Sequence, residues 1–507
     1  MFKFLFSDIL WALLISYTAF AAYSFMPSFI NRLEFSFYDF RMGMLSIPPN
    51  VLPCVIEVPA DRSNHSMLSF EDTEKILSLL SQQENSPELT VFTSRISIPE
   101  TSSSDREIAL IKEKYDELKK HKKITDKGND FSRLISQMQN REKPEKKISS
   151  YLSKIGKYIM PVSFETGTPT AKPRQEPEWL RKFSARSVSG AALASAKSES
   201  VSFSAQEGEG ISDKAAGIGH DGIFPEQDGR TRFECPFIAY NHNLYPSIAL
   251  ETARIMMNIE PGKMRFVPAR ELHIGEKSIP LTSESMMPVY FSKVEPLKYS
   301  SKAIIGGTIA PETFKGRIVI ISAESQNGII TPKGEMPRYS FLVSAIKTMM
   351  SDFFVSRPEW TYKAELGMLL AAGIFIAFAS ILPAALFHSV FAIMAVMFFA
   401  VPLYMFSHEH IWIKPMVPAL CLALGYVFGT VKRFVLRYEL KKIQYSNKPP
   451  PLPRLSRKAK TNSETARQPD NASIRNKVSQ NPTLITLNAT DILVNNANAE
   501  YTAERQK

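Results

Sequence analysis

Three long apolar segments near the C-terminus constrain the fold most strongly. They cover residues 366–386, 390–406 and 412–431, with very short links between them. Each is close to the ~20 residues that a helix needs to cross a hydrocarbon core of ~30 Å. Only helices and closed barrels satisfy their backbone polar groups in lipid, and the alternating pattern of barrel strands is absent. The segments are therefore predicted to be transmembrane helices rather than the core of a soluble protein.

A further apolar segment, residues 5–30, lies near the N-terminus. Its central part, from Ile9 to Met26, is uncharged and long enough to span a membrane. A signal peptide would have a shorter apolar stretch, although the letters AFAAYS resemble a cleavage site. We expect a retained N-terminal span, with cleavage as the alternative.

The positive charge of the chain is concentrated after the last apolar segment. Residues 432–507 hold 15 Lys or Arg and 6 Asp or Glu, which accounts for most of the net charge of +11. Basic residues that follow a last span favour a cytoplasmic tail. With four spans the N-terminus is also cytoplasmic, and residues 31–359 lie outside the cytoplasm. The rest of the chain is close to neutral, so nucleic acid is not an expected partner.

The region between the first and second spans has the pattern of an α/β domain. Residues 53–58 and 90–96 read as strands, and residues 71–80 between them have helical spacing. This βαβ-like order predicts an α/β sheet. Further strands are expected at 158–164, 233–240, 264–267, 288–291 and 317–322, and further helices at 105–122, 246–257 and 339–353.

The predicted organisation has four parts. It comprises an anchor (1–30), an outside α/β domain (31–359), three transmembrane helices (360–432) and a basic tail (433–507). Polar or low-complexity sequence predicts insertions at about 100–150 and 167–214, the second as a mobile loop. The tail is expected to be largely disordered, with a Pro-rich stretch (449–453) and one apolar island (482–494).

Several short patterns follow one another in a characteristic order. They are Leu33-Glu34 with Tyr38-Asp39 and Arg41, VIEVPADRS (55–63), GIGHDGIFPEQDGRTR (217–232), YPSIALETAR (245–254), and FKGRIVIIS followed by Thr-Pro (314–332). With one span before them and three after, this order resembles bacterial receptors that carry the CHASE-type-two extracellular sensory domain. The resemblance covers roughly 30–435 and implies an α/β sensory domain in the periplasm, anchored in the inner membrane.

The chain departs from that family in three places. Gly328 or a neighbour stands where the family usually has an Asp before Thr-Pro, and Arg338-Tyr339 stands near the family's Gly and His. The second strand, with Val91-Phe92-Thr93, lacks the family's acid. The resemblance therefore does not carry a ligand pocket over to this chain. Residues 433–507 are also too few and too polar for the family's usual cyclase or kinase output domain.

Six residues are candidates for ligand binding: Asp61, Arg62, Ser63, His220, Asp228 and Thr331. The first three follow the end of a predicted strand, where α/β sheets place binding residues. The other three belong to the patterns that carry the resemblance. A structural role in a turn or a cap is the alternative for the 61–63 stretch and for His220.

No pattern indicates a metal, a cofactor or a catalytic site. His408-Glu409-His410 offers ligand types that suit Zn²⁺, but a polar link between two spans explains it better. No GxSxG, Walker-type, HExxH or kinase signature occurs. We therefore expect no enzyme activity. Cys54 and Cys235 are either a disulfide outside the cytoplasm or two unpaired cysteines, and Cys421 lies in the last apolar segment.

Two functional hypotheses follow. In the first, the protein is a non-enzymatic sensor or scaffold whose outside domain binds a ligand or an envelope protein and whose tail recruits a partner. In the second, it is a structural component of an envelope complex with a degenerate pocket. Membrane lipid and protein partners on both sides are expected. Gly425 and Gly429 have the GxxxG spacing of helix packing or a homodimer, with lipid-facing small residues as the alternative.

Overall fold

The computed structural model of the 507-residue chain describes most of the region before residue 447. The described residues are 2–45, 53–99, 101–120, 133, 143–166, 176–185, 200–206, 210–291, 295–324 and 328–446. The chain divides into two units, Met1–Lys441 and Lys442–Lys507, and the structural description below concerns the first. The predicted Pro-rich stretch and apolar island of the tail lie outside the described residues.

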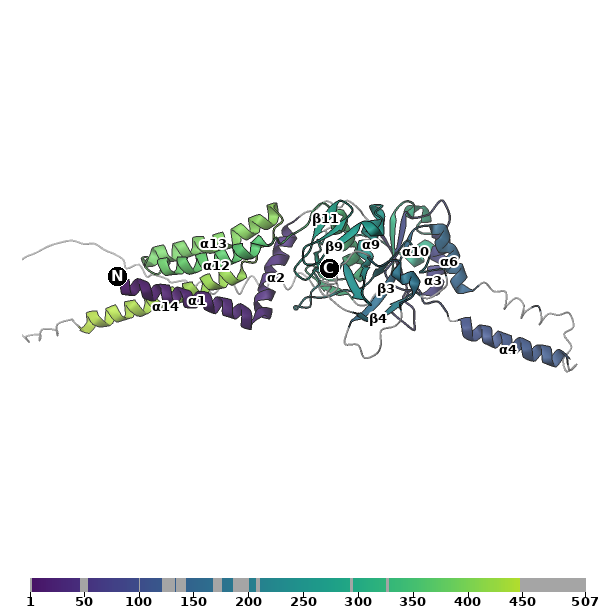
Figure 1. The fold of residues 1–507 in the computed structure, drawn as a ribbon, viewed down its shortest axis with the longest axis horizontal. Helices are drawn as coiled ribbons and strands as arrows, with labels where there is room; N and C mark the ends of the chain where they lie inside the picture. The colour runs from purple at the N-terminus through teal and green to yellow at the C-terminus, as the bar shows by residue number, and fades with distance from the viewer. Residues whose placement is uncertain are drawn as a thin grey trace, which may run out of the picture. The chain divides into compact units, whose positions relative to one another are not determined.

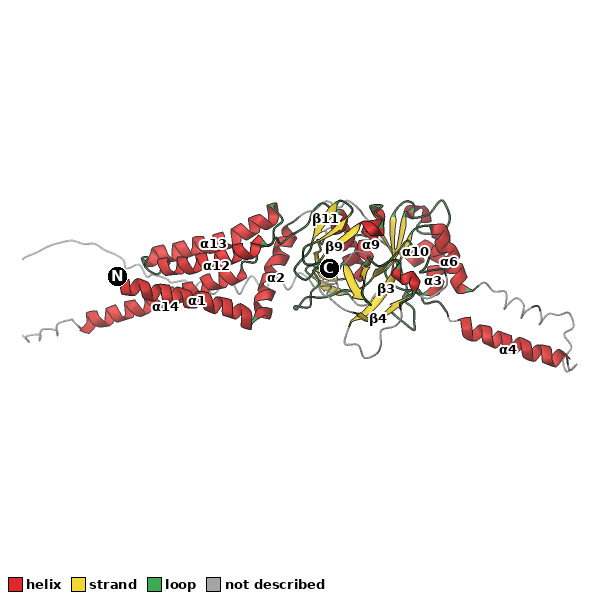
Figure 2. Ribbon diagram, viewed as in Figure 1, coloured by secondary structure: helices red, strands yellow, loops and turns green. Residues whose placement is uncertain are grey.

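Helices and strands alternate through the middle of the chain (Figure 2). The α-helices are α1 (Phe2–Phe25), α2 (Pro27–Met44), α3 (Phe70–Leu80), α4 (Thr101–Lys120), α6 (Pro144–Ile155), α7 (Glu178–Arg181), α9 (Ile248–Met256), α10 (Ser301–Ile305), α11 (Arg338–Met350), α12 (Trp360–Ala379), α13 (Ala384–His408) and α14 (Met416–Ser446). The strands are β1 (Cys54–Val58), β2 (Leu89–Phe92), β3 (Tyr158–Thr166), β4 (Ser200–Ala205), β5 (Gly217–His220), β6 (Phe233–Glu234), β7 (Phe237–Tyr240), β8 (Asn243–Pro246), β9 (Met264–Val267), β10 (Glu271–Ile274), β11 (Lys277–Pro280), β12 (Met287–Pro288), β13 (Leu297–Ser300), β14 (Ile318–Ala323), β15 (Ile329–Thr331) and β16 (Gly334–Met336).

The central element is a seven-stranded, mostly parallel sheet. Its order is β13-β1-β14-β2-β3-β4, and β5 pairs with β3. All pairs are parallel except β3 with β4. This arrangement confirms the predicted α/β class. Because the strands are parallel, their carboxyl ends lie at one edge of the sheet, where open α/β sheets bind ligands.

Helices cover both faces of this sheet (Figure 1). In β14, Ile318 and Ile320 pack with residues of α9 and α11, whereas Val319 and Ile321 pack with residues of α3, α6 and α10. Both faces are buried, and for that reason the strand reads as a continuous apolar run. The run Arg317–Ser322 was predictable because nothing polar interrupts it.

Helix α6 differs from the polar insertion that the sequence predicts over about 100–150. Its residues Ile148, Leu152 and Ile155 recur at helical spacing and are almost fully buried. The neighbouring residues are mostly Lys, Glu and Ser, so the overall composition of the segment is polar although one face of the helix is apolar. The helix packs beside α3 and belongs to the core of the domain.

Strand β4 lies within the segment 167–214 that the sequence predicts as a mobile loop. It extends the sheet beyond β3, and the ring of its Phe203 packs against those of Phe164 and Tyr240. The strand reads Ser-Val-Ser-Phe-Ser-Ala and does alternate, but it is short and stands in a Ser- and Ala-rich segment whose composition is typical of a loop. The short helix α7 in the same segment also buries Leu180.

Three C-terminal helices, α12, α13 and α14, are long and apolar enough to cross a membrane, as predicted. They pack with α1 into a helical bundle (Figure 1). A Cβ on Gly425 would meet Ile376 of α12, and one on Gly429 would meet Phe387 of α13, at about 2.5 Å. The two glycines therefore serve packing between helices of this one chain.

The N-terminal apolar segment is bent. Helix α1 ends at Phe25 and α2 begins at Pro27, which lacks the N–H that would continue the hydrogen-bond ladder of α1. The two helices meet at 88° and qualify as a membrane span only if they are counted together. The single N-terminal span remains a prediction.

Candidate functional site

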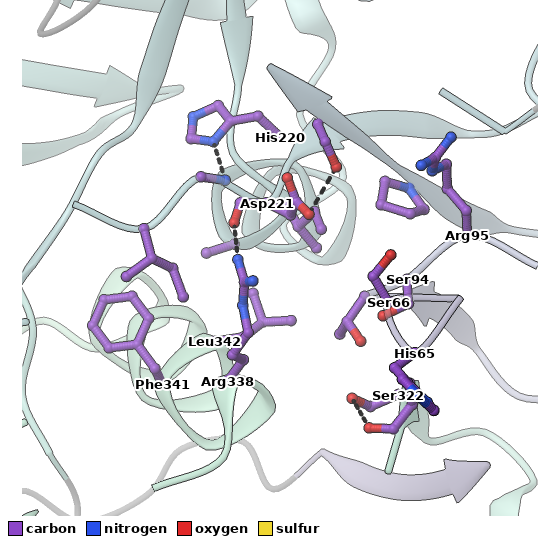
Figure 3. Close-up of a pocket in the computed structure, with 18 of the residues that line it drawn as sticks. His65, Ser66, Ser94, Arg95, His220, Asp221, Ser322, Arg338, Phe341 and Leu342 are labelled. Carbon is purple, nitrogen blue, oxygen red and sulfur yellow. Dashed lines mark hydrogen bonds between the residues drawn. The ribbon is translucent and has the colours of Figure 1, made fainter. Parts of the chain in front are cut away.

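A cavity of about 430 Å³ lies at the carboxyl edge of the sheet. Turns that follow the strands line it, and the start of α11 closes one side (Figure 3). In this view Arg338, Phe341 and Leu342 lie with His220 and Asp221 on one side, and the 64–66 and 93–95 turns lie on the other. Most of the lining residues come from four distant parts of the chain: 64–66, 93–95, 220–223 and 338–342.

The turn after β1 is shaped by Asp61. Its Oδ1 accepts hydrogen bonds from the backbone N–H groups of Ser63, at 2.8 Å, and of Asn64, at 3.1 Å. The Ser63 hydroxyl donates to the same oxygen, and these hydrogen bonds lower the pKa of Asp61 to about 2. The predicted residues 61–63 do not line the cavity themselves, and Arg62 is exposed. They fold the turn that carries Asn64, His65 and Ser66 to the cavity wall.

His220 does line the cavity, at the end of β5. Its Nδ1 accepts a hydrogen bond from the backbone N–H of Gly222 at 3.3 Å, which fixes the turn that presents Asp221. Burial lowers the pKa of His220 to about 3, so the ring is neutral. The preceding Gly219 permits close packing, because a Cβ there would lie 2.5 Å from the backbone of Ile248 in α9.

Asp221 is the polar centre of the cavity. Its Oδ2 accepts a hydrogen bond from the Ser163 hydroxyl at 2.9 Å, and its backbone oxygen accepts one from Arg338 at 2.8 Å (Figure 3). Burial raises the pKa of the Asp221 carboxyl, whereas the charges of Arg338 and Arg95 oppose this rise. The carboxylate therefore lies within the field of two guanidinium groups.

Glu234 also lines the cavity and is 6% exposed. Burial raises the pKa of its carboxyl to about 7, against a smaller opposite effect of a hydrogen bond with Ser247. Sequence reasoning missed Glu234, Arg95 and Arg338. Arg95 follows a strand end, which was a usable signal, but nothing local indicates that Arg338, more than 100 residues beyond His220, reaches the same cavity.

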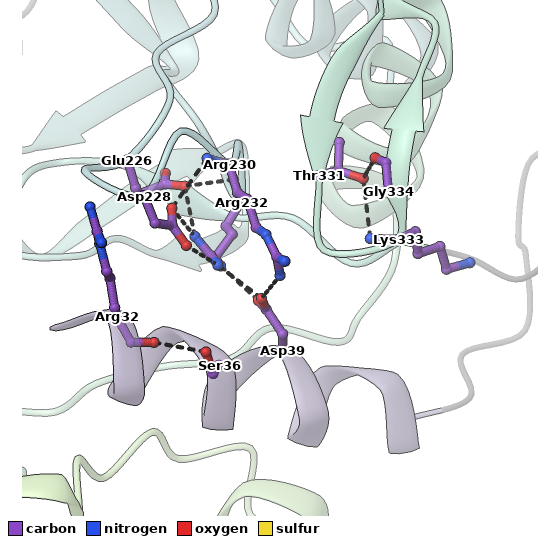
Figure 4. Close-up of polar contacts among 10 residues, drawn as sticks. All are labelled: Arg32, Ser36, Asp39, Glu226, Asp228, Arg230, Arg232, Thr331, Lys333 and Gly334. Carbon is purple, nitrogen blue, oxygen red and sulfur yellow. Dashed lines mark hydrogen bonds and ion pairs between the residues drawn. The ribbon is translucent and has the colours of Figure 1, made fainter. Parts of the chain in front are cut away.

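Asp228 and Thr331 lie away from this cavity (Figure 4). Asp228 forms two hydrogen bonds with Arg232, at 2.9 and 2.7 Å, and Arg232 also forms two with Asp39 of α2. The Thr331 hydroxyl closes the β15–β16 hairpin by donating to the backbone oxygen of Gly334 at 2.9 Å. Asp228 therefore helps to hold Arg232, Thr331 helps to close a hairpin, and neither side chain lines the cavity.

The opening motif of the resemblance forms a joint with the helical region. In α2, Arg41 donates hydrogen bonds to Glu34 at 3.1 Å and to the backbone oxygen of Ile413 at 3.0 Å. The ring of Tyr38 packs on that of Trp412 at 4.7 Å. These residues hold α2 beside the segment that precedes α14.

Neither the cysteines nor the acidic and histidine residues form a covalent or metal-binding cluster in the described part of the chain. Cys54, Cys235 and Cys421 are buried thiols that form no disulfide with one another, so the disulfide alternative is not realised. No group of three or more His, Cys, Asp or Glu side chains suits a metal ion among the described residues. His410 packs its ring on Phe353 at 3.9 Å.

Comparison with known proteins identifies the family. Searches of curated proteins and of solved structures found no match. A sequence model of the CHASE2 domain matches residues 12–382, which is well over half of the chain. The matched part contains the parallel sheet, the cavity and α2. The chain therefore belongs to the CHASE2 domain family.

Proposed function

We propose that this protein is a membrane-bound sensor without catalytic activity, whose α/β domain binds a small polar ligand in the strand-end cavity. The observation that carries the proposal is the position of α11. Its first five residues supply Arg338, Phe341 and Leu342 to one wall, while the opposite wall is formed by turns that follow strands of the sheet. A ligand that contacts both walls changes the position of α11, provided that it binds two states with different affinity.

The end of α11 leads into a segment that is attached to two transmembrane helices. The backbone N–H of Ser356 donates to His410 at 2.9 Å, and that of Trp412 donates to Ser356 at 2.8 Å. Phe353 packs on His410 in the same region. We call residues 353–357 and 410–412 the exit clamp. It joins the segment before α12 to the segment before α14.

Glu365 strengthens this connection. It accepts a hydrogen bond from Arg357 at 2.9 Å and one from the backbone N–H of Lys414 at 2.8 Å. A shift of α11 therefore acts on α12 through the chain and on α14 through the clamp. Because α14 continues toward the tail, a displacement of α14 would transmit ligand binding in the cavity to the tail.

The proposed setting is the bacterial inner membrane. The α/β domain lies in the periplasm, and both termini lie in the cytoplasm. The tail, 433–507, recruits a protein partner, because a sensor without catalytic activity has to act through another protein. The family and the three apolar helices support this setting.

The test uses hydrogen–deuterium exchange on the full-length protein in detergent, with fractions of a periplasmic metabolite extract. We expect a fraction that slows exchange both at the cavity turns and at 353–357. A ligand at 100-fold over its dissociation constant adds about 2.7 kcal/mol of stability, which is easily measured. Ser94→Trp and Leu342→Trp, which fill the cavity, should abolish the effect. Ser153→Trp, on the exposed face of α6, is the matched control.

Two outcomes contradict the proposal. If no fraction protects the cavity turns, the domain does not sense a small molecule, and the role in an envelope assembly becomes the better explanation. If protection stays confined to the cavity and never reaches 353–357, binding occurs without transmission through α11.

A further inference from the structure

The charges that line the cavity are unbalanced. Arg95 and Arg338 carry two positive charges, and Asp221 supplies one carboxylate that both of them influence. Glu234 is about half protonated at pH 7 because burial raises its pKa to about 7, and the buried His220 is neutral. The cavity therefore has an excess of positive charge before any ligand enters.

Both guanidinium groups have hydrogen-bond donors to spare. Arg338 donates one hydrogen bond, to the backbone oxygen of Asp221. Arg95 donates none to any side chain or backbone group that the structure describes. The two residues lie on opposite sides of the cavity in Figure 3. A guanidinium group carries five N–H donors in a planar fork that matches carboxylate and phosphate groups.

The remaining walls are rich in hydroxyl groups. They contribute four Ser and Thr side chains and one amide: Ser66, Thr93, Ser94, Ser322 and Asn64. On the other side, the Asp221 carboxylate has acceptor capacity beyond its hydrogen bond with Ser163. The hydroxyls of Ser66, Thr93 and Ser322 already donate within the protein, and their oxygens can still accept hydrogen bonds from the hydroxyl groups of a ligand. The volume of about 430 Å³ lies in the lower part of the ~300–1,000 Å³ range of ligand sites, which favours a compact molecule.

We propose that the cavity binds a compact, hydroxylated organic anion whose carboxylate or phosphate lies between Arg95 and Arg338 and whose hydroxyl groups pair with Asp221 and the serine-rich wall. This inference rests on the sensor function proposed above and specifies the ligand class. Carboxylates and phosphates share the chemistry that the arginines recognise, so the experiment includes both.

The experiment compares four probes on one carbon skeleton: glucose, glucosamine, gluconate and glucose 6-phosphate. Their binding to the full-length protein in neutral detergent is measured by calorimetry and thermal shift. We expect gluconate or glucose 6-phosphate to bind at least about tenfold more tightly than glucose, because a hydrogen bond to a charged group contributes about 1.5–3 kcal/mol. Arg95→Gln and Arg338→Gln should each remove most of this preference. Arg230→Gln, an arginine away from the cavity, should leave it intact.

Other results overturn the ligand class. Equal or tighter binding of glucose or glucosamine, anion binding that survives Arg95→Gln and Arg338→Gln, or no binding of any probe would each refute it. The sensor proposal is tested separately, because a neutral ligand that still protects residues 353–357 from exchange would leave it standing.

Discussion

Arg232 allows a direct test of how α2 is attached to the α/β domain. Its guanidinium group is 1% exposed and lies between two carboxylates (Figure 4). It donates to Asp39 at 2.6 and 2.8 Å and to Asp228 at 2.9 and 2.7 Å. A third carboxylate, that of Glu226, has its Oε2 at 3.4 Å from Nη1 of Arg232. Arg232→Ala would leave these acids without their buried counter-charge.

The expected loss is large. Removing one partner of a buried ion pair costs about 3–5 kcal/mol. At about 2 °C per kcal/mol for a large domain, the melting temperature should fall by about 6–10 °C. Arg230 is the matched control, since it is 45% exposed and makes one contact with Asp39. Arg230→Ala should cost less than about 1 kcal/mol.

The assay is thermal unfolding of the full-length protein in neutral detergent, followed by intrinsic fluorescence. Arg232→Lys should fall between wild type and Arg232→Ala, because lysine keeps the charge but not the paired hydrogen bonds. Combining Arg232→Met with Asp39→Asn and Asp228→Asn should recover part of the loss, because it removes the unpaired charges. If Arg232→Ala and Arg230→Ala melt at the same temperature, the network does not hold α2.

Three further predictions concern other parts of the molecule. Because the pKa of Glu234 is raised to about 7 in the folded state, its contribution to stability is present below pH ~4.5 and is lost as the pH rises through about 7. Glu234→Gln should flatten the fall of the melting temperature between pH 5 and 8, and an unchanged slope would contradict the assignment. Gly219→Ala should cost about 1–3 kcal/mol, since its Cβ would meet backbone atoms at 2.5 Å, whereas Gly262→Ala, with no atom within 4 Å, should be tolerated. A reporter fused after Lys442 should be active only in the cytoplasm, and activity on the outside would rule out the proposed topology.

The sequence reveals the elements whose signals are continuous and local. The apolar helices and the strands that are buried on both faces are predictable because many consecutive residues share one environment. Helix α6 was missed because only three isoleucine or leucine residues mark its buried side, and strand β4 was missed because its alternation covers only six residues of a Ser- and Ala-rich segment. Both elements lie next to long polar insertions, so their few apolar residues do not stand out along the sequence.

The site was predictable only in part, for a related reason. His220 follows a strand, and the strand-end rule points to its edge of the sheet. Asp228 was selected for its place in a shared pattern, yet that pattern serves the attachment of α2. Arg338 comes from a helix start distant in sequence, and only the folded topology brings it opposite Arg95.

The unbroken path of α14 has a consequence for the signalling proposed above. From Met416 to Lys441 the helix has no break. An α-helix turns by about 100° per residue, so a twist applied beside Trp412 reaches Lys441 as an equal change of angle. Inserting one residue after Val431 would redirect everything beyond it by about 100°, whereas seven residues would restore the direction to within about 20°. In the proposed mechanism, the signal that reaches the tail is a change in the direction that the end of α14 faces. The number of residues in the helix determines that direction before any signal.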